Sequence, residues 1–307
     1  LPLATALGIL TTVTLSIKVE TDRFVRTLTR EDVITALQFA VISVIVLPVL
    51  PNEALGPPPF DVFNPFQIWL MVVLITGISF VGYVLIKFVG AERGIELTGL
   101  LGGLVSSTAV TLSFSERSKS AVKLQKPLAL AIVAAWTILF PRVLIEVGVV
   151  NPALLAVLWP PLVAAGLAGL LYAAYMFFSR ERIEDREIAF SNPFSIYSAL
   201  RFGLLYALIL LIARTSQLYF GDTGVLVSSF FSGFADVNAI SLSVAQLSRN
   251  GSLSLEVAAQ AVVVAVMANT LVKGGIVFAI GSPSLRRAIW PGLLLIVVVG
   301  MSAAFLL

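Results

Sequence analysis

The run FQIWLMVVLITGISFVGYVLIKF, residues 66–88, carries a single charged side chain, Lys87, close to its end. A helix rises about 1.5 Å per residue, so a run of this length reaches across the ~30 Å hydrocarbon core of a bilayer. Similar runs recur between short polar or Pro/Gly-rich connectors. They are continuously apolar rather than alternating, so they predict spanning helices and not barrel strands. The runs lie at residues 1–16, 32–50, 66–88, 97–115, 127–147, 152–178, 197–218, 224–247, 256–281 and 288–307.

The composition also indicates an all-α polytopic membrane protein. Of the 307 residues, 58% are hydrophobic and 12% are charged, about half the charged fraction of soluble domains. The chain has no Cys and no His, which excludes disulfides, thiolate nucleophiles, imidazole bases and the usual zinc ligands. We expect no cofactor apart from a possible bound inorganic ion, and any bound metal would be a hard cation held by oxygen. No phosphate-binding loop or nucleophile elbow appears, so we expect neither an enzyme nor a nucleic-acid partner.

Internal similarity predicts that most of the chain is duplicated. The sequence NPFQIW at residues 64–69 recurs as NPFSIY at residues 192–197. Farther on, the stretch SSTAVTLS that begins at Ser106 matches DVNAISLS, which begins at Asp236. We expect two repeats, residues 64–178 and 192–307. They are preceded by two N-terminal helices within residues 1–50.

The distribution of positive charge predicts how the two repeats cross the membrane. If every segment spans, the Lys and Arg residues of the connectors divide almost evenly between the two sides. If 97–115 and 224–247 are instead re-entrant hairpins, nearly all of them share one side, as the positive-inside rule requires. Only Arg142, Arg214 and Arg249 then fall opposite. We therefore predict two inverted-topology repeats, each with three spanning helices and one broken, re-entrant helical hairpin.

Glycines near the middle of both hairpins are the expected helix breaks. Gly102 and Gly103 lie in the first hairpin and Gly233 lies in the second. Non-helical backbone at membrane depth requires burial in protein or a polar cavity, so a break there would mark a functional site. The alternative is a pair of ordinary spanning helices in which glycine permits close packing.

Polar residues just after these glycines are the candidate ion or substrate path. Asp236 is the only carboxylate that these runs place deep in an apolar segment, where a charge costs at least about 2.5 kcal/mol. We expect it to bind a cation or carry a proton, with Asn238 beside it; the alternative is a structural ion pair with Lys273. The repeat-matched hydroxyls, which we expect to line the path unless they only bond to helix carbonyls, are Ser106, Ser107 and Thr108.

A second group of polar residues lies in the later helices. Asn269 and Lys273 are four residues apart and share one helix face. Asn269 could contact the solute or form an interhelical hydrogen bond. Lys273 is a candidate intramembrane charge partner of Asp236 and could also snorkel toward the membrane surface. Arg142, with Glu146 one turn on as its partner, is expected to snorkel.

Several stretches together resemble a bacterial membrane domain of unknown function that follows MgtC/SapB domains. They are LTGLLGGLVSSTA at residues 97–109, SGFADVNA at 232–239, ANTLVK at 268–273 and LTRED at 28–32. The resemblance implies that the first helix is the end of an MgtC-like domain. It also implies a setting of ion handling in the bacterial inner membrane, because MgtC-like proteins are associated with magnesium homeostasis. It assigns no residue roles.

The sequence therefore predicts a multi-pass inner-membrane transporter or channel for an ion or small polar solute. We favour a cation, with Mg²⁺ as one candidate, and a path at the repeat interface. Two alternatives remain: an anion transporter or channel that uses the positive half-helix N-termini, and a non-transporting regulatory or assembly protein. We expect the partners to be the lipid bilayer and the small ion or solute, and the protein to be a homo-oligomer.

Overall fold

The computed structural model of the chain describes residues 29–89, 95–121, 124–178 and 196–306. Every regular element in these ranges is helical. The predicted first helix (1–16) and the second NPF motif (192–194) lie outside the described residues. The nine predicted segments that begin at residue 32 and beyond all correspond to helices, which confirms the helical class.

The first two-thirds of the bundle follow the predicted segments closely. A leading arm consists of α2 (Arg30–Ala40), a π-helical turn (Val41–Val46) and α3 (Leu47–Val49). This arm lies against the outside of α4, where the indole nitrogen of Trp69 donates to the carbonyl of Ile42 at 2.8 Å. The helices that follow are α4 (Pro65–Val89), α5 (Ile95–Ser120), α6 (Gln125–Thr137), α7 (Leu139–Val150) and α8 (Pro152–Phe178).

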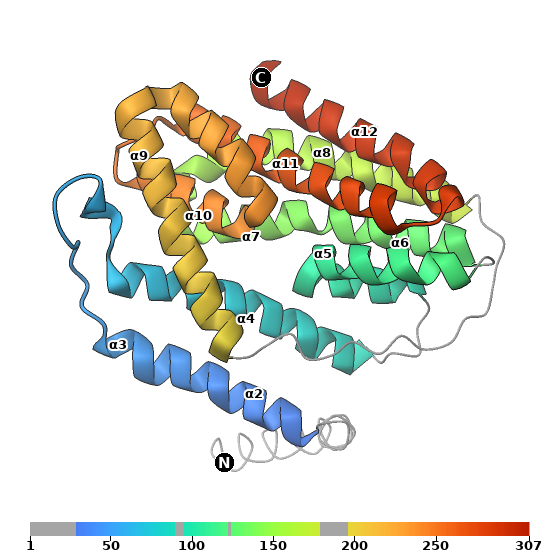
Figure 1. Cartoon of the computed structure of the whole chain (residues 1–307), viewed down its shortest axis with the longest axis horizontal. Coiled ribbons are helices and arrows are strands. Elements are labelled where there is room, and N and C mark those ends of the chain that lie inside the picture. Colours follow the sequence, from blue (N-terminus) through green and yellow to red (C-terminus); the bar gives the residue numbers. More distant parts are fainter. Residues whose placement is uncertain (1–28, 90–94, 122–123, 179–195, 307) are drawn as a thin grey trace, which may run out of the picture.

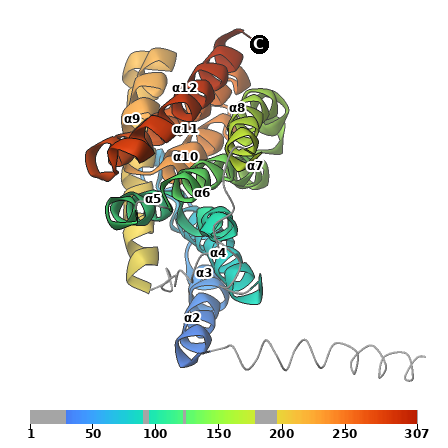
Figure 2. The ribbon, with the colours of Figure 1, turned by 90° about the vertical axis from the view of Figure 1, so that its right-hand side faces the viewer.

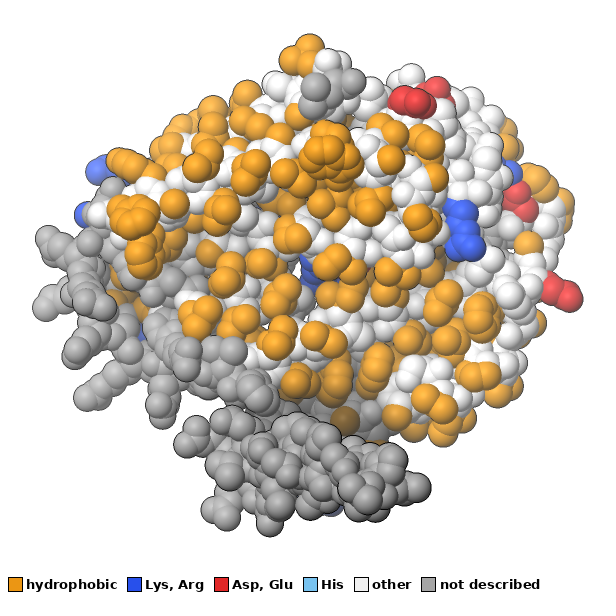
Figure 3. All heavy atoms as spheres, turned by 180° about the vertical axis from the view of Figure 1, so that it is seen from behind, with side chains coloured by type: hydrophobic (Ala, Val, Ile, Leu, Met, Phe, Trp, Pro, Cys, Tyr) orange, Lys and Arg blue, Asp and Glu red, His pale blue; other side chains and the backbone are white. Residues whose placement is uncertain are grey.

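The remaining helices are α9 (Ile196–Ala235), α10 (Val237–Arg249), α11 (Leu255–Ile280) and α12 (Pro283–Leu306). Figure 2 shows α6, α10 and α11 in the interior of the bundle, with α9, α8 and α12 around them. The described residues contain eight stretches that are long and apolar enough to cross a membrane. The back of the molecule is largely hydrophobic, and most of the charged side chains visible on it lie toward its edges (Figure 3). These features agree with a multi-pass membrane protein.

Helix α9 is longer than one crossing requires and folds back on itself. Its 40 residues would span about 60 Å as one straight helix. The helix reverses at Gly221, whose φ of 59° lies in the left-handed region that favours glycine. After the turn the chain passes so close to the first half that a Cβ on Gly224 would lie 2.4 Å from the carbonyl oxygen of Ser216.

The predicted glycine breaks were wrong by three or four residues. Gly102, Gly103 and Gly233 are helical, and the helices break instead at Ser106 and Asp236. A glycine costs a helix only about 1 kcal/mol, which is too little to end it in lipid. A break also needs a group that can cap the new helix N-terminus, and Ser and Asp supply one.

The glycines serve close helix packing, as the alternative interpretation proposed. A Cβ on Gly103 would lie 2.7 Å from the Cα of Ala135 in α6. A Cβ on Gly233 would lie 2.5 Å from the carbonyl oxygen of Ala265 in α11. In both places the backbones of two helices touch without a side chain between them. Each broken segment is therefore held tightly against a buried helix.

Candidate functional site

The two helix breaks have the same local structure. Ser106 has φ −162° and ψ 100°, and Asp236 has φ −159° and ψ 115°. The Ser106 hydroxyl accepts a hydrogen bond from the backbone nitrogen of Ala109 at 3.2 Å. The Asp236 carboxylate accepts from the backbone nitrogens of Asn238 and Ala239 at 2.8 and 3.0 Å. Each residue is thus the N-cap of the helix that follows it.

Arg142 stabilises the helix end that precedes the first break. Its side chain is 7% exposed. One guanidinium nitrogen donates to the carbonyl oxygens of Leu104 and Val105 at 3.1 and 3.3 Å. Another forms a salt bridge with Glu146 at 2.8 Å. The predicted pairing with Glu146 is confirmed, but the expected snorkelling of Arg142 is wrong because the guanidinium binds backbone carbonyls inside the bundle.

Asn269 does the same for the helix end that precedes the second break. Its side-chain nitrogen donates to the carbonyl oxygen of Gly233 at 3.1 Å. Of the two roles expected for Asn269, the structure has the interhelical hydrogen bond. Carbonyls at a helix C-terminus lack partners within the helix. Arg142 of α7 supplies a partner to two carbonyls before the first break, and Asn269 of α11 supplies one to a carbonyl before the second.

Lys273 lies at the first break and does not pair with Asp236. The side chain is 0% exposed, and its Nζ donates to the Ser107 hydroxyl at 3.2 Å. Asp236 interacts electrostatically with Arg142 instead. The alternative interpretation of Asp236, a structural ion pair with Lys273, is therefore wrong. Lys273 of α11 and Arg142 of α7 thus both bind the broken helix α5, one on each side of Ser106.

Most of the predicted site residues thus gather around the two breaks. Ser106, Asp236 and Asn238 are half-buried and Ser107 is buried, while Thr108 is exposed just after the first break. Asn269 and Lys273 are buried in α11. Two central residues, Arg142 and Glu146, were not among the predicted site residues. The predicted segment ended at residue 147, which put both near a membrane surface, whereas α7 continues to Val150. Their i, i+4 spacing was the available signal.

Two buried oxygen atoms near Asp236 have no hydrogen-bond partner. They are Oε2 of Glu146 and Oδ1 of Asn238. Glu146 is fully buried and interacts electrostatically with the Asp236 carboxylate. Buried acceptors without a donor are costly, and carboxylate and amide oxygens are ligands for hard cations. This side of the site can therefore bind a cation or a proton.

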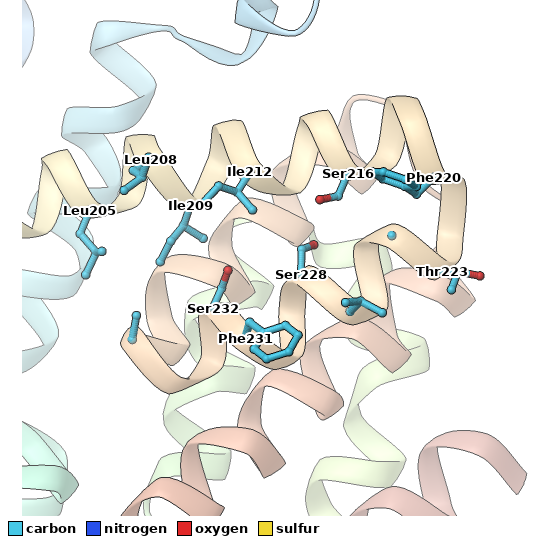
Figure 4. Close-up of a pocket in the computed structure, with 13 residues that line it drawn as sticks. Leu205, Leu208, Ile209, Ile212, Ser216, Phe220, Thr223, Ser228, Phe231 and Ser232 are labelled. Atoms are coloured by element: carbon cyan, nitrogen blue, oxygen red, sulfur yellow. The ribbon is translucent and has the colours of Figure 1, made fainter.

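An apolar groove lies between the two halves of α9 (Figure 4) and has a volume of about 600 Å³. It begins near Phe220 and Thr223 and ends at Ala235, next to Asp236. The lining consists mainly of Leu, Ile, Val and Phe side chains, with the hydroxyls of Ser228 and Ser232 near the break. Such a lining suits a hydrocarbon chain better than an ion.

Both breaks, Arg142, Glu146 and Lys273 lie within residues 73–281, which match the DUF4010 family model, described as a domain of unknown function. The chain belongs to the DUF4010 family. It is also similar to an uncharacterized protein of Aquifex aeolicus, with 34% identity over 192 residues that cover 62% of this chain and 84% of the relative. No solved structure matches the chain.

The family match confirms the expected domain of unknown function. It begins at residue 73. The helix expected to be the end of an MgtC-like domain, at residues 1–16, lies outside both the match and the described residues. Membership of the DUF4010 family therefore places the helix breaks in the family domain and assigns no chemistry to them.

Proposed function

We propose that this DUF4010 protein is a transporter or channel for an ion or small polar solute, with its path where the two helix breaks meet. The observation that carries the proposal is a group of ionisable side chains beside two capped breaks, in which Arg142, Glu146 and Lys273 are buried and Asp236 is half-buried. Ionisable residues inside a membrane are costly and usually belong to a pathway or a relay. Broken helices at membrane depth are the usual place for substrate and ion sites in transporters.

The proposed architecture is a pair of inverted repeats, residues 64–178 and 192–307. Ser106 and Asp236 have the same conformation and the same capping role. The contacts of Gly103 with Ala135 and of Gly233 with Ala265 also correspond. Each of these pairs of positions has the same separation along the chain. Matching local structure therefore supports the duplication in addition to the sequence similarity.

Contacts at the helix ends support re-entrant hairpins. In the structure the second hairpin consists of the part of α9 after Gly221 and of α10. Near its start, Gly224 packs against Ser216. Just after its end the chain returns to the neighbouring Gln217, whose amide donates to the carbonyl of Ser252 at 2.8 Å. Both of its ends therefore lie at the start of α11. The first hairpin ends at the other end of α11, where the Ser118 hydroxyl accepts from the backbone nitrogen of Ser282 at 2.9 Å.

The start of the first hairpin lies at that same far end. Helix α4 begins beside the exit of the second hairpin, because Gln246 donates to Gln67 at 3.0 Å. Its 25 residues carry the chain about 37 Å away, and α5 starts only a few residues later. The two hairpins would thus open to opposite sides of the membrane, as in the inverted-repeat plan.

A cation is the favoured substrate. Oε2 of Glu146 and Oδ1 of Asn238 have no partner, and the Asp236 carboxylate lies within electrostatic reach of Glu146. A site with so few carboxylates would leave several waters on Mg²⁺. We place the protein in the bacterial inner membrane as a homo-oligomer without enzyme activity. A non-transporting regulator is the alternative, in which the same charges only hold helices together.

Flux in proteoliposomes tests the proposal. Uptake of Mg²⁺, Na⁺ and K⁺ would be followed with entrapped ion-sensitive dyes for the wild type and for Asp236→Asn. Asn keeps the N-cap and removes the charge, so we expect flux to fall at least tenfold while the fold is retained. Asp222→Asn, at an exposed aspartate of α9, is the matched control. Absence of protein-dependent flux, or unchanged flux in Asp236→Asn, would overturn the cation proposal.

A further inference from the structure

The two breaks have matching backbones but unequal charges. At the second break the N-cap is Asp236, and the nearby cation is Arg142. At the first break the N-cap is Ser106, which is neutral, and the nearby cations are Lys273 and Arg142, of which Arg142 is paired with Glu146. The second break therefore contains a carboxylate between a helix N-terminus and a basic side chain. At the first break Glu146 is bound to Arg142, and no carboxylate is bound to Lys273.

Lys273 has few partners for a charge so deeply buried. Among the described residues its Nζ donates only to the Ser107 hydroxyl, and no carboxylate forms an ion pair with it. Its electrostatic neighbour is Arg142, which carries the same sign. An ammonium group has three N–H donors, and a buried charge needs a counter-charge and hydrogen bonds to be tolerated.

The start of the helix after Ser106 adds to this positive environment. Residues 107–120 form a helix of more than three turns, whose N-terminus carries partial positive charge. The Ser106 hydroxyl caps this helix by accepting a hydrogen bond from the backbone nitrogen of Ala109. The Ser107 oxygen accepts from Lys273, so the Ser107 hydroxyl hydrogen is free to be donated elsewhere. Ser106 is half-exposed and Thr108 is exposed, so the break is accessible from outside the chain.

We infer that a small anion binds at the first break, between Lys273 Nζ, the Ser107 hydroxyl and the backbone N–H groups at the start of the helix 107–120. The bound anion takes the place that the Asp236 carboxylate occupies at the second break. This site shares Lys273 with the group that carries the proposed function, but it uses none of the oxygen ligands of the proposed cation site, which belong to Glu146, Asp236 and Asn238. The anion would neutralise Lys273 even if the protein transports no cation.

Anion-dependent thermal stability tests the site. The purified full chain in detergent would be unfolded in gluconate, a large organic anion. Chloride, nitrate, acetate or sulfate would then replace gluconate at constant ionic strength. We expect at least one of them to raise the Tm of the wild type saturably, by about 4 °C when the site is nearly full. Lys273→Met should lose this dependence and have a higher Tm than the wild type in gluconate, because an uncompensated buried charge is removed.

Two further variants keep the test decisive. Ser107→Ala removes one ligand and should weaken anion binding about tenfold without removing the charge, which serves if Lys273→Met does not fold. Lys119→Met, at an exposed lysine of the same helix, should respond to anions as the wild type does. A wild type that is indifferent to all four anions overturns the site, and so does an unchanged anion response in both Lys273→Met and Ser107→Ala. Cation flux does not enter this result, so the two proposals can fail separately.

Discussion

Arg142 and Glu146 form a buried salt bridge of 2.8 Å one helical turn apart in α7. The guanidinium also donates to the carbonyls of Leu104 and Val105, so one side chain joins α7 to the first helix break. A buried pair contributes little net stability relative to apolar residues, but removal of one partner leaves the other charge uncompensated. The pair therefore makes the stabilities of α7 and the broken helix α5 depend on each other.

Arg142→Met should destabilise the protein by about 3 kcal/mol or more, because Glu146 and two carbonyls lose their partner. The double variant Arg142→Met/Glu146→Gln should recover part of this loss. Unfolding by SDS in mixed micelles measures both, with Arg287→Met at an exposed arginine as the control. A double variant no more stable than Arg142→Met would show that the pair is not coupled in this way.

Substitution of the two packing glycines should be costly. Gly233→Ala would place its Cβ 2.5 Å from the carbonyl oxygen of Ala265, and Gly103→Ala would place its Cβ 2.7 Å from the Cα of Ala135. Backbone cannot move away cheaply, so each should lose about 1–3 kcal/mol. Gly275→Ala meets nothing within 4 Å and should stabilise its helix by about 0.5–1 kcal/mol. Equal effects at all three positions, in the same unfolding assay, would contradict the close packing.

The capping role of Asp236 can be separated from its charge. Asp236→Ala removes the acceptor for the backbone nitrogens of Asn238 and Ala239 and should cost about 1–2 kcal/mol. Asp236→Asn retains an acceptor and should lower the free energy of unfolding by only a few tenths of a kcal/mol, ~0.3 kcal/mol. Unfolding free energies would rank the two variants. If Asn were as destabilising as Ala, the charge and not the cap would hold the second break together.

The inverted arrangement predicts opposite sides for the exits of the two hairpins. Because the chain has no Cys, single cysteines report without background. Ser120→Cys at the end of α5 and Asn250→Cys after α10 are both exposed positions. A membrane-impermeant thiol reagent added to intact cells should label one and not the other, and permeabilised cells should label both. Labelling of both cysteines from the same side of the membrane would contradict the inverted topology.

The spans, and the neighbourhood of each break, could be predicted from the sequence because they depend on local properties. Hydropathy and length located the nine described segments, and the internal similarity paired Ser106 with Asp236 before any contact was known. Breaks were nevertheless placed at Gly103 and Gly233, three residues early. Flexible backbone is visible in a sequence, whereas its use for a turn or for close packing depends on the opposing helix.

Only the tertiary structure decided the partners of the buried charges. Lys273 was a candidate partner of Asp236 but lies against Ser107, and Arg142 was expected at the membrane surface but lies at the first break. Hydropathy describes how deep a residue lies along its own helix and carries no information about which helices face each other. The pairing of charges across helices is set by the packing of α7 and α11 against the broken segments, and so it arises only when the chain is folded.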